Sequence, residues 1–402
     1  MARVLNLYLD TSLVAQLTSV PGDRSILTLT EAYLADETRL TLSLGFKGED
    51  NTIAYEPKTR QTKIDPYLSN LLPEGRLREY VAERDHVHPE REFELLRILG
   101  EDLPGGLIAR LARDDGDANE PIADQEPTEQ DDPIKFSLAG VQMKLSALKD
   151  ATGGLTIPAT GKGGNWIVKF PSERFAAVPE NEFWMMTLAK RVGLPTPEID
   201  LVDVKSIGGM PEGIRNDLGR ALVVKRFDRA EGKRIHMEDF GQIFRVYPKD
   251  KYKKANYEMI GEVVWREVGE EGFADYVRRL VVNAAIGNGD MHLKNWSLFY
   301  PDGRKPQLAP IYDYVSTLTY VQSEGMGLNL ADSKRFEDVR MESFIALADR
   351  VKAPTRPVVK VVKDTVEQIH AVWKEVAKEA ELPKVITQAI TDHLGRLPLL
   401  RQ

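Results

Sequence analysis

Two side chains suited to phosphoryl transfer, Asp290 and Asn295, are separated by four residues in the segment NAAIGNGDMHLKNWSLF at 283–299. That spacing is typical of the catalytic loop of protein kinases. There, the aspartate accepts the proton of the substrate hydroxyl and the asparagine holds magnesium. Asn-Gly-Asp is also a favoured turn sequence, and an isolated pair of this kind more often marks an ordinary turn. The pair therefore indicates a kinase only in combination with further groups.

A second carboxylate and a buried lysine are candidates for those further groups. Asp313 follows an apolar stretch in LAPIYDYVS, where a kinase needs another magnesium ligand, although one aspartate at a strand end is usually a cap. Lys169 stands in the apolar segment WIVKF, where an unpaired ammonium group is costly to bury. It either reaches water from an edge strand or binds nucleotide phosphates. Glu182, early in the next predicted helix, is placed to pair with it and is equally consistent with an ordinary acidic helix start.

Two further segments are weaker signals. FSLAGVQMKLS at 136–146 precedes the Lys169 strand, where a phosphate-covering loop would lie, but its single glycine matches neither GxGxxG nor a P-loop. VVKRFDR at 223–229 predicts a strand leading into Phe227 and Asp228, which could supply an adenine-facing hinge and a ribose acceptor. A salt-bridged strand exit is the alternative. The chain order of all these groups is that of kinases, and it favours a phosphotransferase.

The elements that position these groups divide the chain into four regions. With 402 residues, the chain is expected to form two or three domains at roughly 100–200 residues each. Hydrophobic periodicity predicts strands and helices in the following segments: strands at 2–15, 38–44, 166–170 and 221–227, and helices at 66–82, 90–99, 181–193 and 358–376. We therefore predict the following regions: an α+β module at 1–112, an acidic linker at 113–132, a β-rich lobe at 133–235 and a helical lobe at 236–402.

Composition excludes several classes of protein. The chain has 54 Lys and Arg against 62 Asp and Glu, a net charge of −8, which disfavours a free-standing basic nucleic-acid binder. Nine acidic and no basic residues at 114–132 account for that excess. The absence of cysteine removes disulfides and thiolate chemistry, and the six histidines form no HExxH motif. Without a signal peptide or membrane-spanning stretch, we expect a cytoplasmic protein with no membrane partner.

The motifs taken together resemble the HipA family of serine/threonine kinases, the toxins of bacterial type II toxin–antitoxin modules. The resemblance covers nearly the whole chain, and no single motif carries it. The matching segments, in family order, are NLLPEGRLRE (70–79), LLRILGEDLPGGL (95–107), SLAGVQMK (137–144), WIVKFP (166–171), NE (181–182), VKRFDR (224–229), MEDFGQ (237–242), GNGDMHLKNWSLF (287–299) and LAPIYDYVS (308–316). The fold it implies is α+β and bilobal, like a protein kinase, with a β-rich N-terminal lobe, an extra N-terminal subdomain and an all-helical C-terminal lobe.

The resemblance also implies ATP and Mg2+ as cofactors and assigns a role to each matching residue. Asp290 would be the catalytic base, Asn295 and Asp313 would hold magnesium, and Lys169 would contact the ATP phosphates. Ser137 would be an autophosphorylation site that switches the kinase off by displacing its loop. The implied nucleotide site consists of Ser137, Ala139, Gly140, Gln142, Lys144, Lys169, Lys225, Phe227, Asp228, His292 and Tyr312.

Two positions depart from better-known members of the family. Lys225 stands where some members have Glu, and we expect nucleotide binding to survive because hinge contacts are largely made by the main chain. Met143 stands where better-known members have Glu in the loop, which affects the details of loop closure.

The implied activity is phosphorylation of a serine on a translation component, in the best-known members an aminoacyl-tRNA synthetase and commonly the glutamyl enzyme, which leads to growth arrest and persistence. The implied partner is a HipB-like helix-turn-helix antitoxin, through which most contact with operator DNA would be made. Two alternatives stay open. One is a catalytically weak or silent corepressor that acts with the antitoxin, and the other is a kinase for a small molecule.

Overall fold

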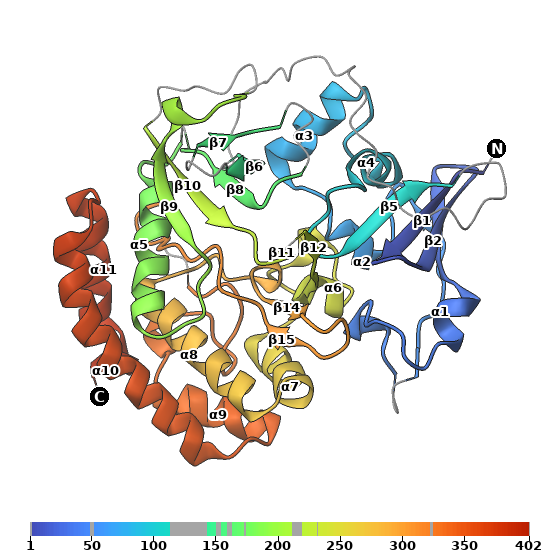
Figure 1. Cartoon of the computed structure of the whole chain (residues 1–402). Helices are drawn as coiled ribbons and strands as arrows, with labels where there is room; N and C mark the ends of the chain where they lie inside the picture. The colour runs from blue at the N-terminus through green and yellow to red at the C-terminus, as the bar shows by residue number, and fades with distance from the viewer. Residues whose placement is uncertain are drawn as a thin grey trace.

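Three parts of the chain surround one cavity in the computed structural model, which describes residues 2–48, 52–112, 143–149, 154–158, 163–172, 174–210, 219–230, 232–321 and 325–401 (Figure 1). An N-terminal module, drawn in blue, lies beside a five-stranded sheet, drawn in green, and both lie against a helical lobe, drawn in yellow to red. Each part has its own cluster of buried apolar side chains. The mixed α and β class and the bilobal architecture agree with the prediction from the sequence.

The N-terminal module is an antiparallel sheet of order β4-β3-β2-β1-β5 covered by short helices. Buried residues alternate with half-buried ones along β1, which confirms the predicted strand, and the turn after it, where Asp10 has a positive φ of 54°, leads into β2. The elements are β1 (Val4–Leu9), β2 (Ser12–Val20), β3 (Arg24–Leu29), α1 (Glu31–Ala35), a 3-10 helix (Leu44–Phe46), β4 (Arg60–Gln61), α2 (Pro66–Ser69), α3 (Gly75–Arg84), α4 (Glu92–Leu99) and β5 (Leu107–Leu111).

The structure corrects two predicted elements of this module. The segment 38–44 is not a strand, because its polar groups bond to the helical lobe instead of a neighbouring strand. The Thr41 amide donates to the Gly303 carbonyl at 2.9 Å, and the Leu44 amide donates to Glu238 Oε1 at 2.9 Å. The helix predicted at 66–82 is divided into α2 and α3, since Pro73 has no amide hydrogen and disfavours continuation of the helix.

The β-rich lobe is an antiparallel sheet of order β7-β6-β8-β10-β9. Its elements are β6 (Lys144–Lys149), β7 (Leu155–Thr156), β8 (Trp166–Lys169), α5 (Val178–Arg191), β9 (Ile199–Asp203), a 3-10 helix (Val204–Ser206), β10 (Arg220–Lys225), and the hairpin β11 (Arg229–Ala230) and β12 (Lys233–Arg234). The register of β6 against β8 places Lys144 directly opposite Lys169. Two cations in that arrangement repel each other unless an anion lies between them.

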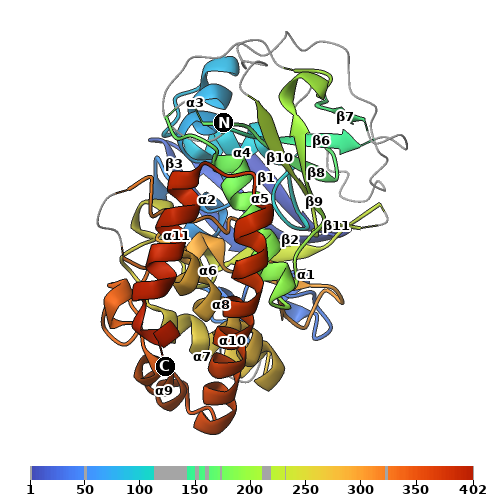
Figure 2. The same ribbon diagram turned by 90° about the vertical axis from the view of Figure 1, so that its left-hand side faces the viewer.

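The C-terminal lobe is mainly helical, but it contains a small sheet of order β13-β14-β15, so the prediction of an all-helical lobe was wrong in this respect. Its elements are β13 (His236–Asp239), α6 (Phe240–Ile243), α7 (Tyr257–Glu267), α8 (Glu270–Ile286), β14 (Ser297–Tyr300), β15 (Gln307–Leu308), α9 (Met341–Val351), α10 (Thr355–Glu379), α11 (Lys384–Arg396) and 3-10 turns at Pro248–Asp250, Leu293–Asn295, Phe336–Asp338 and Pro398–Arg401. The amphipathic pattern at 358–376 forms the central part of α10, as predicted. Figure 2 shows α10 and α11 side by side at the outer face of this lobe.

Helix α5 follows the β-rich lobe in sequence but buries its apolar side chains in the core of the helical lobe. Met185, Met186 and Leu188 all belong to that cluster. The helix therefore joins the two lobes, and it carries Glu182 between them.

Candidate active site

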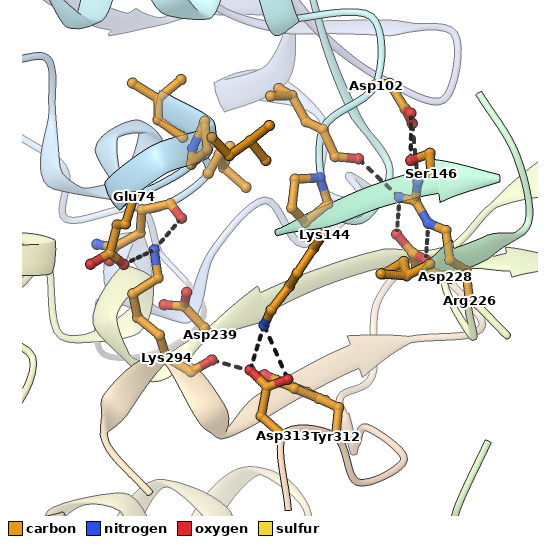
Figure 3. A pocket seen from close by; sticks show the side chains of 18 of the residues that line it. Glu74, Asp102, Lys144, Ser146, Arg226, Asp228, Asp239, Lys294, Tyr312 and Asp313 are labelled. Atoms are coloured by element: carbon orange, nitrogen blue, oxygen red, sulfur yellow. Dashed lines mark hydrogen bonds and ion pairs between the residues drawn. The ribbon is translucent and has the colours of Figure 1, made fainter. Parts of the chain in front are cut away.

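A cluster of four charged groups joins the β-rich lobe to the helical lobe. Lys169 Nζ lies in ion-pair contact with both Glu182 Oε1 and Asp313 Oδ1, and Lys144 Nζ lies 3.0 Å from Asp313 Oδ2. Of the two interpretations that the sequence left open for Lys169 and Glu182, the structure therefore shows the ion pair. Figure 3 shows Lys144 reaching from its strand toward Asp313. Asp313 is the anion that allows two lysines to stand opposite each other on adjacent strands.

The charges of this cluster stabilise one another. Burial opposes the charge on Lys169, but Asp313 and Glu182 outweigh burial and hold its pKa above the ordinary lysine value. For Asp313, burial is likewise outweighed by Lys144 and Lys169, so its pKa lies far below the ordinary value. Burial raises the pKa of Glu182, which has Lys169 as its main opposing charge. Asp313 also has a left-handed backbone with φ of 55°, a conformation that aspartate tolerates better than most residues.

The loop that carries Asp290 and Asn295 begins where α8 ends at Gly287. A left-handed φ of 66° ends the helix there, and a Cβ at this position would lie 2.5 Å from Leu318 Cγ, which explains the glycine. Asn295 Nδ2 donates to the Asp290 carbonyl at 2.8 Å, and this hydrogen bond closes the loop. Strand β14 starts two residues after Asn295 and pairs with β13, which anchors the loop in the small sheet.

The Asp290 carboxylate accepts a hydrogen bond from the Tyr252 hydroxyl through Oδ1. Partial burial raises the pKa of Asp290, and the Tyr252 hydrogen bond opposes that shift. His292 Nε2 lies 3.9 Å from Asp290 Oδ1, and its ring contacts the Tyr252 ring edge-on with centroids 4.8 Å apart. Burial, with help from the charge of Lys251, lowers the pKa of His292 to about 3, so this imidazole is neutral at pH 7.

The predicted nucleotide residues of the strand exit lie in two different settings. Phe227 stacks on Tyr312 with an angle of 28° between rings, and both line the cavity, where they form an aromatic wall. Lys225 is exposed, and its Nζ lies 3.3 Å from Glu198 Oε2.

Asp228, by contrast, is buried in a network of charges. Its carboxylate accepts from Arg226 and Arg229 at 2.8 Å each and from the Gly105 amide at 2.8 Å. Arg226 also lies 3.1 Å from Asp102 of the N-terminal module. This is the salt-bridged strand exit that the sequence left open as the alternative to a ribose acceptor.

These groups line a cavity of about 580 Å3 between the three parts of the chain (Figure 3). Of the predicted site residues in the described parts of the chain, those on its wall are Lys144, Lys169, Lys225, Phe227, Asp228, Asp290, His292, Tyr312 and Asp313. Asn295 is held at the Asp290 loop. Ser137, Ala139, Gly140 and Gln142, and the acidic segment 114–132, lie outside the described residues.

The structure adds residues that the sequence patterns did not single out. Glu74 of the N-terminal module lies 2.9 Å from Lys251 Nζ and 3.1 Å from Lys294 Nζ, and all three line the cavity. The fourth added residue is Tyr252, whose hydroxyl donates a hydrogen bond to Asp290. Glu74 and Lys294 fall within motifs of the family resemblance, but the segment with Lys251 and Tyr252 carries no pattern that would have identified it.

The donor set at Asn295 and Asp313 fits magnesium. An amide oxygen and a carboxylate suit this cation, which binds proteins through one or two such ligands and takes the rest from phosphates and water. Within the described residues no group of three or more His, Cys, Asp or Glu could hold a metal, and a magnesium site shared with phosphates needs none. The Asp313 carboxylate lies at the cavity wall and is already in contact with the two ammonium groups of Lys144 and Lys169, as expected of a group that binds cations.

The fold and the cavity define a bilobal, protein-kinase-like protein with an additional N-terminal module. The chain belongs to the HipA family: residues 5–110 match the HipA N-terminal domain, and residues 136–373 match the HipA-like C-terminal domain.

Relatives and a solved structure agree with that assignment. The Sinorhizobium fredii protein named "Putative kinase Y4dM" is 42% identical over 99% of this chain and 98% of its own length. The Serine/threonine-protein kinase toxin HipA of Shewanella oneidensis is 26% identical over 68% of this chain and 67% of its own. The HipA chain in the Shewanella oneidensis complex of HipA, HipB and operator DNA has a TM-score of 0.73 at 21% identity, with 99% and 96% of the two chains covered. This last likeness concerns the fold.

No helix within the described ranges is long and apolar enough to cross a membrane.

Proposed function

We propose that this chain is an ATP-dependent serine/threonine protein kinase. The observation that carries the proposal is the convergence of Asp290, Asp313 and Lys169 on one cavity, with Asn295 held at the same loop. These are the groups that phosphoryl transfer requires, and Lys169 comes from a segment more than 100 residues before the other three.

Each group has a defined part in the proposed reaction. Asp290 accepts the proton of the acceptor hydroxyl while the oxygen of that hydroxyl bonds to the γ-phosphorus of ATP. The bond between this phosphorus and the β-phosphate oxygen breaks, and ADP leaves. Lys169 leaves Asp313 to bind phosphate oxygens and keeps Glu182 as its partner. Asn295 and Asp313 would hold Mg2+, which supplies positive charge to the phosphates when bound. The Phe227–Tyr312 wall offers an aromatic surface for the adenine ring.

We further propose that this chain is the toxin of a toxin–antitoxin module. The acceptor would be a serine of a translation component, an aminoacyl-tRNA synthetase such as the glutamyl enzyme, with Ser137 as the autophosphorylation site. A HipB-like antitoxin would bind the chain and make most of the contact with operator DNA. The fold shared with a HipA chain that is in complex with HipB and operator DNA supports this partner.

The first experiment is incubation of dephosphorylated protein with magnesium and labelled ATP, followed by mapping of phosphate by mass spectrometry. We expect phosphate on Ser137 in the wild type and none in Asp290→Ala, because loss of a general base typically costs about 10²- to 10⁴-fold in rate. Ser137→Ala should lose self-phosphorylation and retain activity on substrate. Absence of transfer from fully dephosphorylated wild type would overturn the kinase proposal in favour of the corepressor, and operon repression would then be assayed with purified antitoxin.

A further inference from the structure

The N-terminal module contacts Lys294 of the catalytic loop through the Glu74 carboxylate and the Asn70 carbonyl. Glu74 lies immediately before α3, at the N-terminal end of that helix. Its two oxygens lie 2.9 Å from Lys251 Nζ and 3.1 Å from Lys294 Nζ (Figure 3). The side chains of Lys251 and Lys294 are 21% and 15% exposed, so their ammonium groups are only partly hydrated.

Lys294 connects Glu74 to the proposed metal ligands. It is the residue before Asn295, and its carbonyl accepts a hydrogen bond of 3.0 Å from the hydroxyl of Tyr312, the residue before Asp313. Its ammonium group also donates to the Asn70 carbonyl of the N-terminal module at 2.8 Å. A shift of Lys294 would therefore be transmitted to both proposed magnesium ligands.

Lys251 connects Glu74 to the proposed base. The next residue is Tyr252, whose hydroxyl donates to Asp290 Oδ1. The Leu293 amide donates to the Lys251 carbonyl at 3.4 Å, so this segment lies directly against the catalytic loop. The Asp290 side chain remains 48% exposed, which leaves room for an acceptor hydroxyl beside the contact with Tyr252.

Glu74 is charged wherever the protein is folded at ordinary pH. Burial alone would raise its pKa, but Lys294 and Lys251 outweigh burial and lower that pKa to about 2. Without this carboxylate, two partly buried ammonium groups would face each other beside the cavity. They would separate or move toward other anions, of which Asp290 and Asp239 line the same cavity.

We propose that Glu74 is a positioning residue by which the N-terminal module fixes the catalytic loop, through Lys251 and Tyr252 on one side and Lys294 on the other. The inference rests on the proposed kinase function. It assigns to the N-terminal module an indirect part in phosphoryl transfer, through the residues that hold the catalytic loop.

The test compares Glu74→Gln with Glu94→Gln as a matched control. Glu94 is a second carboxylate of the same module held by two cations, Arg3 and Arg97, but it does not line the cavity. The readouts are the self-phosphorylation rate at saturating ATP and the ATP concentration that gives half that rate. We expect Glu74→Gln to lower the rate about 10-fold with half-saturation unchanged, because small misplacements of reacting groups cost up to about 10²-fold. Glu94→Gln should match the wild type.

A second readout does not depend on activity. Hydrogen exchange of the 287–296 and 248–254 segments should be faster in Glu74→Gln than in wild type and unchanged in Glu94→Gln. Equal exchange in all three proteins would overturn the inference whether or not the kinase is active, as would equal rate losses in both variants. Absence of phosphoryl transfer in wild type would overturn the proposed function instead.

Discussion

Lys169 offers the sharpest test of how charge is held at this site. The side chains of Lys169 and Glu182 are 5% and 3% exposed, so the pair is shielded from water. In Lys169→Met the Glu182 carboxylate stays buried without its partner, and breaking a buried pair in this way typically costs about 3–5 kcal/mol of stability. Asp313 adds little to this loss, because it keeps Lys144 and is 24% exposed. We therefore expect a fall of about that size in the free energy of unfolding.

The assay is urea denaturation of wild type, Lys169→Met, Glu182→Gln and the double variant. The double variant leaves no unpaired charge, so it should recover most of the lost stability. Both proteins that carry Lys169→Met should lack phosphoryl transfer, because a methionine offers no charge to phosphates. The raised folded-state pKa of Glu182 adds a pH signature. In Lys169→Met the folded state holds a proton more tightly than the unfolded state, so its stability deficit should shrink as the pH falls.

Two results would refute this reasoning. If Lys169→Met and the double variant were equally destabilised, the unpaired carboxylate would not be the cause of the loss. If the double variant transferred phosphate at the wild-type rate, Lys169 would have no part in the reaction.

Three further predictions concern other charged groups. Burial raises the pKa of Glu238 from 4.5 to about 7, so the stability of wild type relative to Glu238→Gln should fall by about 3 kcal/mol between pH 4.5 and 7.5; urea unfolding of both proteins across this range checks it, because the other titrating groups cancel in the difference. Arg226→Met leaves Asp102 and Asp228 short of a cation and should lower stability by about 3–5 kcal/mol, measured in the same way. Asp313→Ala should stay folded by circular dichroism, yet lose about 100-fold or more in labelled-phosphate transfer.

Predictions from the sequence were correct where the residues of a single helix or strand determine its structure. Periodicity placed the first strand, α5 and the long helix α10 correctly, because side-chain alternation and amphipathic spacing are properties of a single segment. The pairing of Lys169 with Glu182 was one of two interpretations that the sequence left open, because a lysine on an apolar strand is costly to bury unpaired.

Predictions failed where the partner of a segment is distant in sequence. The segment 38–44 has the alternation of a strand, but its amides and hydroxyls bond to Glu238 and Gly303 in the helical lobe. At Asp228, for which the sequence left both a ribose acceptor and a salt-bridged strand exit open, the structure shows pairing with the neighbouring Arg226 and Arg229 and a hydrogen bond from the distant Gly105 amide. The role of Glu74 was not predicted from the sequence, because its ion-pair partners lie more than 170 residues away along the chain.

The sequence by itself determined the family and the groups suited to phosphoryl transfer, because motif order and residue chemistry are written along the chain. Only the tertiary structure decided how those groups are held. Strand register put Lys144 opposite Lys169, and the packing of lobes placed Asp313 between them. The docking of the N-terminal module brought Glu74 to the catalytic loop. The physical reason is that ion pairs and hydrogen bonds depend on distances in space, which chain spacing does not specify across 100 residues or more.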